Sequence, residues 1–144
     1  TETILGAAAQ LHEIGLHIEY KRHHEHGEYI LSHIDLPGFT RLQRSAIRDL
    51  VAQHRLTINT QIFEKYHEDY RPMLKGLLRI LRIAVVLCLR RQNKHIPEVS
   101  LSCDDSKWTL TFPEGWLKSH PLINAELANE CWLQHKAGCE LVCK

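Results

Sequence analysis

A long apolar stretch with helical periodicity, from Pro72 to Arg91, constrains the fold of this chain more than any other feature. Pro72 suits the first turn of a helix, because a proline there removes no hydrogen bond that the helix would make. The apolar residues that follow recur at spacings of three and four, so they share one wide face. This face consists of Met73, Leu74, Leu77, Leu78, Leu81, Ala84, Val85 and Cys88. The pattern predicts a central, buried helix.

A second helix is predicted to begin at Thr40. Thr40 and Gln43 form the pattern of a capping box, in which each side chain bonds the backbone N–H of the other residue. Apolar residues lie on one face and are followed by His54, which is predicted to be a hydrogen-bonded core histidine. The apolar face is Ala46, Ile47, Leu50 and Val51, and a basic face is Arg41, Arg44, Arg48 and Arg55.

The residues before Thr40 predict shorter elements. Apolar residues from Ile4 to Leu11 have helical spacing, and Gly15 is a suitable residue to end that helix. A short helix is expected at 29–31, and the Pro-Gly pair inside 35–39 predicts a turn. Residues 1–95 are therefore expected to form one α-helical domain.

The sequence pattern changes after Asn93. Val99, Leu101 and Cys103 alternate with polar residues, a turn is predicted at 104–106, and alternation resumes over 108–112, which indicates a β-hairpin. A helix is then expected from His120–Pro121 to Gly138, followed by a strand over 139–143. The fold class is mainly α, with a β-β-α-β appendage over residues 96–144.

Composition limits the function classes. The net charge of the 144 residues is +1, which gives no general argument for binding nucleic acid or membrane. The longest apolar run, 83–89, is too short to span a bilayer, which takes about 20 residues. Five cysteines without a C-x-x-C pair favour reduced thiols and a cytoplasmic protein. A start without methionine, inside an expected helix, suggests a fragment of a longer protein.

His12 and Glu13 form the strongest candidate for metal chemistry. A histidine beside a carboxylate at a helix end, facing a later long helix, is the arrangement in all-helical phosphohydrolases of the HD type. In this chain the site is incomplete, because Val85 stands where the pattern requires an aspartate, and valine cannot bind a metal. The preferred interpretation is a degenerate HD remnant with structural hydrogen bonds. The histidine cluster at 23–26 is similarly expected to be a solvated loop.

Basic residues offer a second kind of site. Lys75, Arg79, Arg82 and Arg90 project onto one narrow stripe of the long helix. Arginine presents a planar fork that matches two phosphate oxygens, so this stripe and the basic face of the Thr40 helix can line a groove for a polyanion. A solvated charged surface is an equally good interpretation. The sequence contains no P-loop, nucleophile motif or Cys/His dyad of recognisable spacing.

Several blocks together resemble the C-terminal half of the exopolyphosphatase / guanosine pentaphosphate phosphohydrolase (Ppx/GppA) family, over nearly the whole chain. The blocks are LHEIGLHIEY, HHEHGEYIL, DLPGF, RILRIAVVLCLRR and IPEVSL with WTLTFPEGWLKSHPL. The IPEVSL and WTLTFPEGWLKSHPL blocks are more similar to the guanosine pentaphosphate branch than to the long-chain polyphosphatases.

The resemblance implies that catalysis and substrate binding involve different domains of a longer parent protein. Catalysis would belong to N-terminal actin-like domains that use Mg²⁺, so no catalytic residue, metal ligand or cofactor is expected in this part. The C-terminal part would be an HD-like helical domain with a small appendage that helps to bind polyphosphate or guanosine pentaphosphate (pppGpp) and to form a homodimer. No membrane or specific nucleic acid is expected as a partner. The predicted substrate-binding residues are Lys21, Arg22, His24, Lys75, Arg79, Arg82 and Arg90.

Three functions are consistent with these residues and with the resemblance. The leading hypothesis is an accessory module that holds the polyanionic substrate of a phosphoanhydride hydrolase and assembles its dimer. The first alternative is an autonomous metal-dependent phosphohydrolase of the HD type, which needs a metal at His12 and Glu13. The second alternative is a purely structural dimerisation domain whose basic stripes are solvated.

Overall fold

The computed structural model describes residues 6, 8, 29–31, 37–88, 98–105 and 107–144. The chain divides into two compact units, residues 1–81 and 82–144, which we call the first and second unit. The division falls inside one continuous helix, α4 (Arg71–Cys88). The predicted boundary at residue 95 stays a prediction, because 89–97 lie outside the described residues.

The first unit contains α3 (Arg41–Ala52), the 3₁₀ helix η2 (Thr60–Phe63) and the beginning of α4. The predicted capping box at the start of α3 is confirmed: the Gln43 amide donates to Thr40 Oγ1 at 3.1 Å, and the Thr40 amide donates to Gln43 Oε1 at 2.9 Å. His54 is buried, as predicted, and its Nδ1 donates to the Val51 carbonyl at 2.5 Å. The core of this unit includes Ile47, Leu50, Val51, Phe63, Leu74, Leu77, Leu78 and Leu81.

The helix α4 confirms the predicted central helix and corrects its buried face. Leu74, Leu77, Leu78 and Leu81 are buried, as expected, but Ala84 is exposed and Val85 is only half-buried. In the second unit the helix instead buries Arg82 and Ile83. The buried face differs between the two halves of α4 because each half packs into the core of a different unit.

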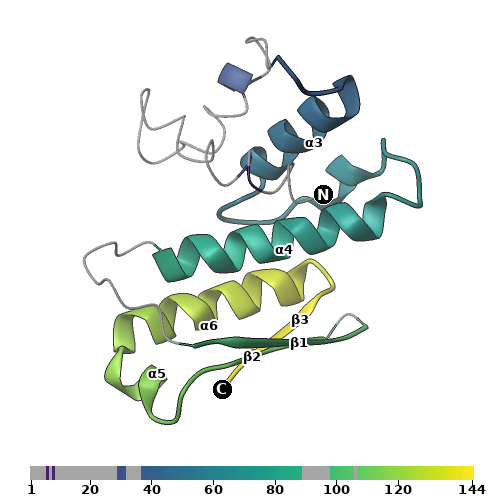
Figure 1. Cartoon of the computed structure of the whole chain (residues 1–144). Helices are drawn as coiled ribbons and strands as arrows, with labels where there is room; N and C mark the ends of the chain where they lie inside the picture. Colours follow the sequence, from purple (N-terminus) through teal and green to yellow (C-terminus); the bar gives the residue numbers. More distant parts are fainter. Residues whose placement is uncertain (1–5, 7, 9–28, 32–36, 89–97, 106) are drawn as a thin grey trace. The chain divides into compact units, whose positions relative to one another are not determined.

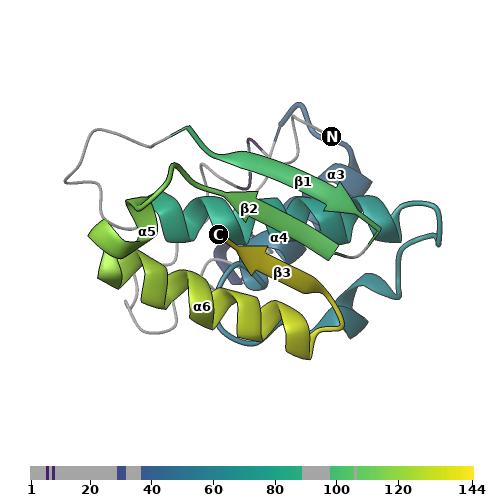
Figure 2. The same ribbon diagram turned by 90° about the horizontal axis from the view of Figure 1, so that it is seen from below.

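The second unit confirms the predicted β-β-α-β order. Strand β1 (Ser100–Asp104) pairs antiparallel with β2 (Lys107–Thr111), and β2 pairs parallel with β3 (Glu140–Cys143). The sheet order is β1-β2-β3, so β2 is central (Figure 2). A short helix α5 (Trp116–Ser119), which the sequence pattern did not predict, precedes α6 (Pro121–Lys136).

Turn residues at the ends of these elements fit their backbone conformations. Asp105, in the predicted hairpin turn, has a φ of 51°, a left-handed conformation that aspartate tolerates better than most residues. Gly138 follows α6 with a φ of 85°, the position at which glycine commonly ends a helix. Gly138 therefore lets the chain reverse from α6 into β3 (Figure 1).

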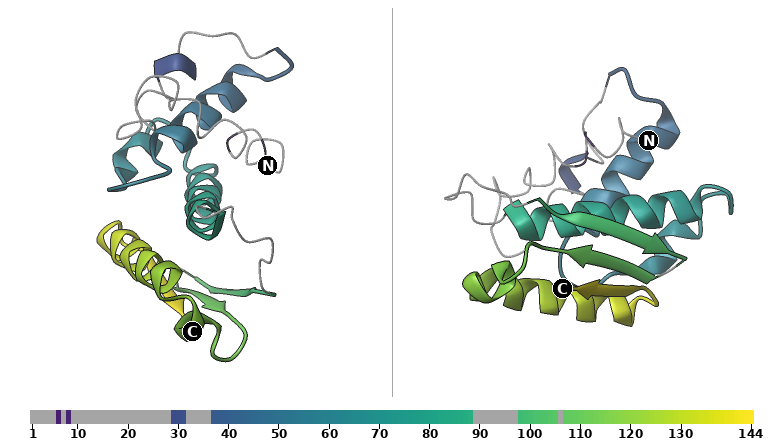
Figure 3. Two further views of the ribbon diagram at one scale, coloured as in Figure 1. Left: turned by 90° about the vertical axis from the view of Figure 1, so that its left-hand side faces the viewer. Right: turned by 60° about the horizontal axis from the view of Figure 1, so that its bottom comes forward.

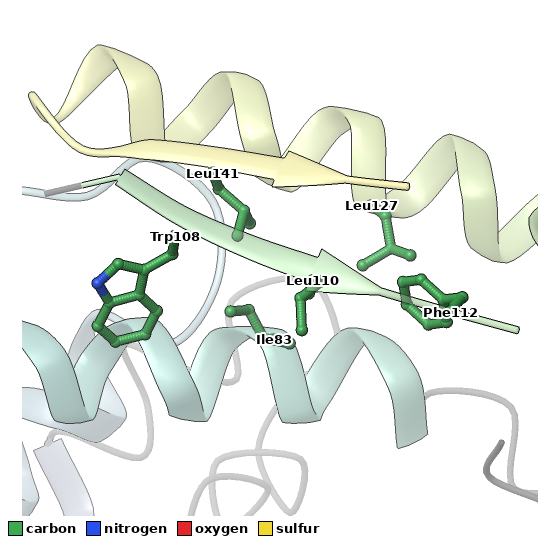
Figure 4. Packing of buried hydrophobic residues seen from close by; sticks show 6 residues of the cluster. All are labelled: Ile83, Trp108, Leu110, Phe112, Leu127 and Leu141. Carbon is green, nitrogen blue, oxygen red and sulfur yellow. The ribbon is translucent and has the colours of Figure 1, made fainter. Parts of the chain in front are cut away.

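The core of the second unit lies between the sheet and its helices. Alternate residues of β2, Trp108 and Leu110, are buried, while every residue of β1 is exposed. Figures 3 and 4 show α6 running along the sheet, with Leu127 and Leu141 directed into the cluster. The cluster consists of Ile83, Trp108, Leu110, Phe112, Leu127 and Leu141.

Candidate functional site

The structure separates the residues that were predicted to bind substrate. Lys75 is exposed on α4, whereas Arg79 and Arg82 of the same helix are buried. Lys21, Arg22, His24 and Arg90 lie outside the described residues, as do the HD remnant residues His12 and Glu13.

Arg82 is part of a buried polar network in the second unit. Its guanidinium binds the Glu130 carboxylate through two bonds, Nε to Oε2 at 2.9 Å and Nη2 to Oε1 at 3.1 Å. Gln134 Nε2 also donates to Glu130 Oε2 at 2.9 Å. Arg82 is 1% exposed and Glu130 is 4% exposed. A bidentate pair in such a site fixes the orientation of both helices locally.

This network corrects the predicted basic stripe. Arg82 does not lie on a solvent-facing surface, because its fork is already occupied by a carboxylate inside the unit. Arg79 is also buried, so the four predicted residues do not form one exposed row along α4. Periodicity places a charged residue on the solvent side by default, and it could not reveal a partner 48 residues away.

A second charged cluster lies in the first unit around Asp49. The Asp49 side chain is 1% exposed on α3, and its Oδ2 accepts from the Tyr66 hydroxyl at 2.5 Å and lies 2.8 Å from Lys65 Nζ. Arg48 Nε is 3.7 Å from Asp49 Oδ1. Ser45 Oγ lies 2.8 Å from the Tyr66 hydroxyl. Two cations therefore surround one buried carboxylate, and the Asp49 cluster has an excess of positive charge.

The sequence pattern did not reveal the Asp49 cluster. One signal was available, since Asp49 stands between the apolar residues Ile47 and Leu50 and three positions after Ala46. That spacing puts the carboxylate on the edge of the buried face, where a buried charge needs partners. The partners Lys65 and Tyr66 come from the irregular segment after η2 and had no recognisable pattern.

Burial of Tyr66 and the hydrogen bond that it donates to Asp49 raise the pKa of this tyrosine above its ordinary value. The folded protein thus holds the phenolic proton more tightly than the unfolded chain does. The resulting stabilisation is present below the unfolded pKa of about 10 and is lost as the pH rises above it.

We therefore expect the free energy of unfolding to fall above about pH 10, by up to about 1.4 kcal/mol per pH unit from this group. In the Tyr66→Phe variant, the free energy of unfolding should not show the part of this fall that Tyr66 causes. Urea unfolding across the alkaline pH range measures the difference. The exposed Tyr70 provides the matched control, because Tyr70→Phe should keep the wild-type slope. Equal slopes for wild type and Tyr66→Phe would contradict the interpretation.

An open groove of about 210 Å³ adjoins this cluster and includes Tyr66 in its wall; we call it the α3–α4 groove. Its lining comes from the beginnings of α3 and α4 and the segment between η2 and α4, and it is largely apolar. The lining residues are Thr40, Leu42, Gln43, Ala46, Tyr66, Tyr70, Met73 and Leu74. The groove can hold an uncharged part of a ligand, while charged groups would be bound by the basic residues beside it.

Charge is unevenly distributed between the described parts of the two units. Residues 37–81 contain eight Lys and Arg against four Asp and Glu, an excess of four positive charges. Residues 98–144 contain four Lys and Arg against seven Asp and Glu, an excess of three negative charges. The near-neutral total therefore conceals a basic segment, residues 37–81, which is the part of the chain suited to a polyanion.

Metal chemistry finds no support in the described ranges, where no group of three or more His, Cys, Asp or Glu side chains is placed to hold a metal ion. Nor does any described helix combine the length and the hydropathy required to cross a bilayer.

Comparison with known sequences defines the family. The family described as Ppx/GppA phosphatase, domain III, matches residues 1–131. The chain belongs to the Ppx/GppA phosphatase family. The family predicted from the sequence blocks is confirmed, and the matching part of the family is its third domain.

Several curated relatives of this chain are named guanosine-5'-triphosphate,3'-diphosphate pyrophosphatase. The protein from Pseudoalteromonas atlantica is 51% identical over 143 residues, which cover 99% of this chain and 28% of the relative. The protein from Aeromonas hydrophila is 42% identical over 135 residues, which cover 94% of this chain and 27% of the relative. This chain therefore spans little more than a quarter of the length of these relatives.

Proposed function

We propose that this domain is an accessory module that holds the polyanionic substrate of a larger phosphoanhydride hydrolase and does not itself hydrolyse it. The observation that carries the proposal is the positive excess of residues 37–81, set against the negative excess of residues 98–144. Membership of the Ppx/GppA family supports the class of substrate, and the names of the relatives favour pppGpp over polyphosphate.

The basic face of α3 is the best-placed surface for this role. Arg41 is exposed, and Arg44 and Arg48 are half-buried, at spacings of three and four that put them on one side of the helix. Such a row of arginines can neutralise consecutive phosphates of a polyanion, and no particular phosphate has to pair with a particular arginine. Lys75, exposed on α4, adds a fourth cation from the same unit.

The α3–α4 groove suits the uncharged part of a nucleotide. Tyr66 and Tyr70 both contribute to its wall, and aromatic rings provide surfaces on which a base can stack. Polyphosphate has no such part, so the groove favours pppGpp as the ligand. Binding of phosphate by Lys21, Arg22, His24 and Arg90 remains a prediction.

The remaining features of the longer parent protein are part of the same proposal. N-terminal actin-like domains would carry out catalysis with Mg²⁺, and the domain described above would be HD-like, cytoplasmic and part of a homodimer. Exposed Leu122 and Trp132 on α6 supply apolar surface that an assembled protein could cover.

A charge-reversal experiment tests where the polyanion binds. The double variant Arg41→Glu/Lys75→Glu reverses two exposed cations of the first unit. Its affinity for pppGpp and for polyphosphate, measured by calorimetric titration of this chain, should fall by roughly tenfold or more at low salt.

Lys107→Glu/Lys118→Glu is the matched control, because it changes the net charge equally on exposed residues of the second unit. This control should bind with nearly wild-type affinity. If both double variants lose affinity equally, binding depends on net charge alone and the assignment to the first unit is wrong. If neither loses affinity, the basic residues are only a solvated surface.

A further inference from the structure

Two cysteines of the second unit face each other across the contact between a helix and a strand. Cys131 on α6 and Cys143 on β3 are reduced in the structure, with their Sγ atoms 3.7 Å apart. Both side chains are half-buried and pack against the core cluster of this unit. The pair is distant in sequence from the basic segment 37–81 and has no role in the proposed binding of polyanions.

The fold itself brings the two thiols together. Cys131 comes one helical turn after Leu127, so both lie on the side of α6 that faces the sheet. Cys143 comes two residues after Leu141, so both point to the same face of the sheet. Main-chain bonds between Lys144 and β2 hold this end of β3 in place.

One thiol activates the other. The hydrogen bond from Cys143 lowers the pKa of Cys131, since it stabilises the thiolate of Cys131. The same bond, together with burial, raises the pKa of Cys143. Cys131 is therefore the better nucleophile of the two, and Cys143 carries the proton.

We propose that Cys131 and Cys143 form a redox-active dithiol, which a peroxide converts to an intrachain disulfide that links β3 to α6. In the first step the Cys131 thiolate attacks one peroxide oxygen, the O–O bond breaks, and Cys131 becomes a sulfenic acid as water leaves after protonation. In the second step Cys143 attacks the sulfur of Cys131, the S–O bond breaks, and the hydroxyl group leaves as water with the thiol proton. The two thiols lose two electrons in total, and the peroxide accepts them.

Only a small movement separates the two states. The sulfur atoms must approach from 3.7 Å to a disulfide bond length of about 2.05 Å, which rotation of the two side chains can largely supply. The bond would close the segment 132–142, which contains the turn at Gly138. Oxidation would therefore lock the edge strand β3 to its neighbouring helix without altering the order of the sheet.

Peptide mapping of this chain after treatment with hydrogen peroxide tests the proposal. Cleavage after Lys136 and after Glu140 separates Cys131, Cys139 and Cys143 into different peptides. The expected product is a linked peptide pair containing Cys131 and Cys143, with the loss of two hydrogen atoms, that a dithiol reductant reverses. Peptides linked through Cys139 or Cys103 in equal yield, or no intrachain link at all, would overturn the proposal.

Single substitutions distinguish formation of the Cys131–Cys143 disulfide from unspecific oxidation of cysteines. In Cys143→Ser the sulfenic acid at Cys131 should persist and react with dimedone, whereas Cys131→Ser should form no intrachain link. Cys103→Ser and Cys139→Ser are the matched controls and should form the link normally. Oxidised wild type should unfold about 5 °C or more above the reduced protein, and Cys131→Ser should show no such shift. An oxidised protein with an unchanged or lower Tm would contradict the proposed link between strand and helix.

Discussion

Replacing Arg82 by methionine is expected to lower the free energy of unfolding by about 3–5 kcal/mol. The substitution removes both bonds that the guanidinium makes to Glu130 and leaves a carboxylate in a site that is 4% exposed. An unpaired charge in such a site costs far more than the ion pair contributes, since water cannot replace the lost partner. Urea unfolding at neutral pH measures the change.

A double variant separates this effect from simple loss of packing. In Arg82→Met/Glu130→Gln no unpaired charge remains at this position, and the new amide oxygen can still accept from Gln134 Nε2, as Glu130 does in the native protein. We expect the double variant to recover about half or more of the stability lost by Arg82→Met. A single variant within about 1 kcal/mol of wild type would show that Arg82 is not paired as described.

Leu127→Ala is expected to cost about 2–5 kcal/mol, with the exact value set by how far the cavity collapses. Leu127 is fully buried, and Figure 4 shows its side chain extending from α6 toward Phe112, within the cluster. Truncation removes apolar contact and leaves a cavity that neighbouring side chains fill only in part.

Leu122→Ala provides the control on the same helix. Leu122 is 56% exposed, so its truncation should change the free energy of unfolding by only about 0.5 kcal/mol. Both variants place alanine in α6, which removes helix propensity as an explanation for any difference between them. Equal destabilisation by the two variants would mean that α6 does not pack through Leu127.

Local signals in the sequence predicted most of the fold. The capping box at Thr40, the hairpin turn at Asp105 and the ends of α6 at Pro121 and Gly138 are each determined by residues close together in the chain. The short helix α5 was not predicted, because it is only four residues long and has no side-chain cap.

Long-range pairings could not be predicted in the same way. Arg82 was placed on a basic stripe, available to a polyanion or to solvent, because periodicity averages over one helix and says nothing of Glu130 on another. The Asp49 cluster was missed for a related reason, since Lys65 comes from an irregular segment. Cys131 and Cys143 belong to two different elements, and only the packing of α6 on the sheet brings them together.

The family resemblance supplied what local patterns could not. The blocks from 11–20 to 108–122 led to the Ppx/GppA family, which comparison with known sequences then confirmed. The substrate-binding residues stay a prediction, and they were chosen by charge and periodicity. Arg41, Arg44 and Arg48 on α3, together with Lys75, are better placed on the described surface than Arg79 and Arg82.

Whether this domain holds a polyanion without hydrolysing it can be decided by titrating the chain with polyphosphate and with pppGpp. The titration uses two salt concentrations, with and without Mn²⁺, and released phosphate is assayed in the same samples. We expect binding that weakens as salt increases, with no phosphate released under any condition. Metal-dependent release of phosphate would contradict the proposed role and would restore His12 and Glu13 as ligands of a working HD-type site. Absence of binding even at low salt would contradict it equally and would favour a purely structural domain.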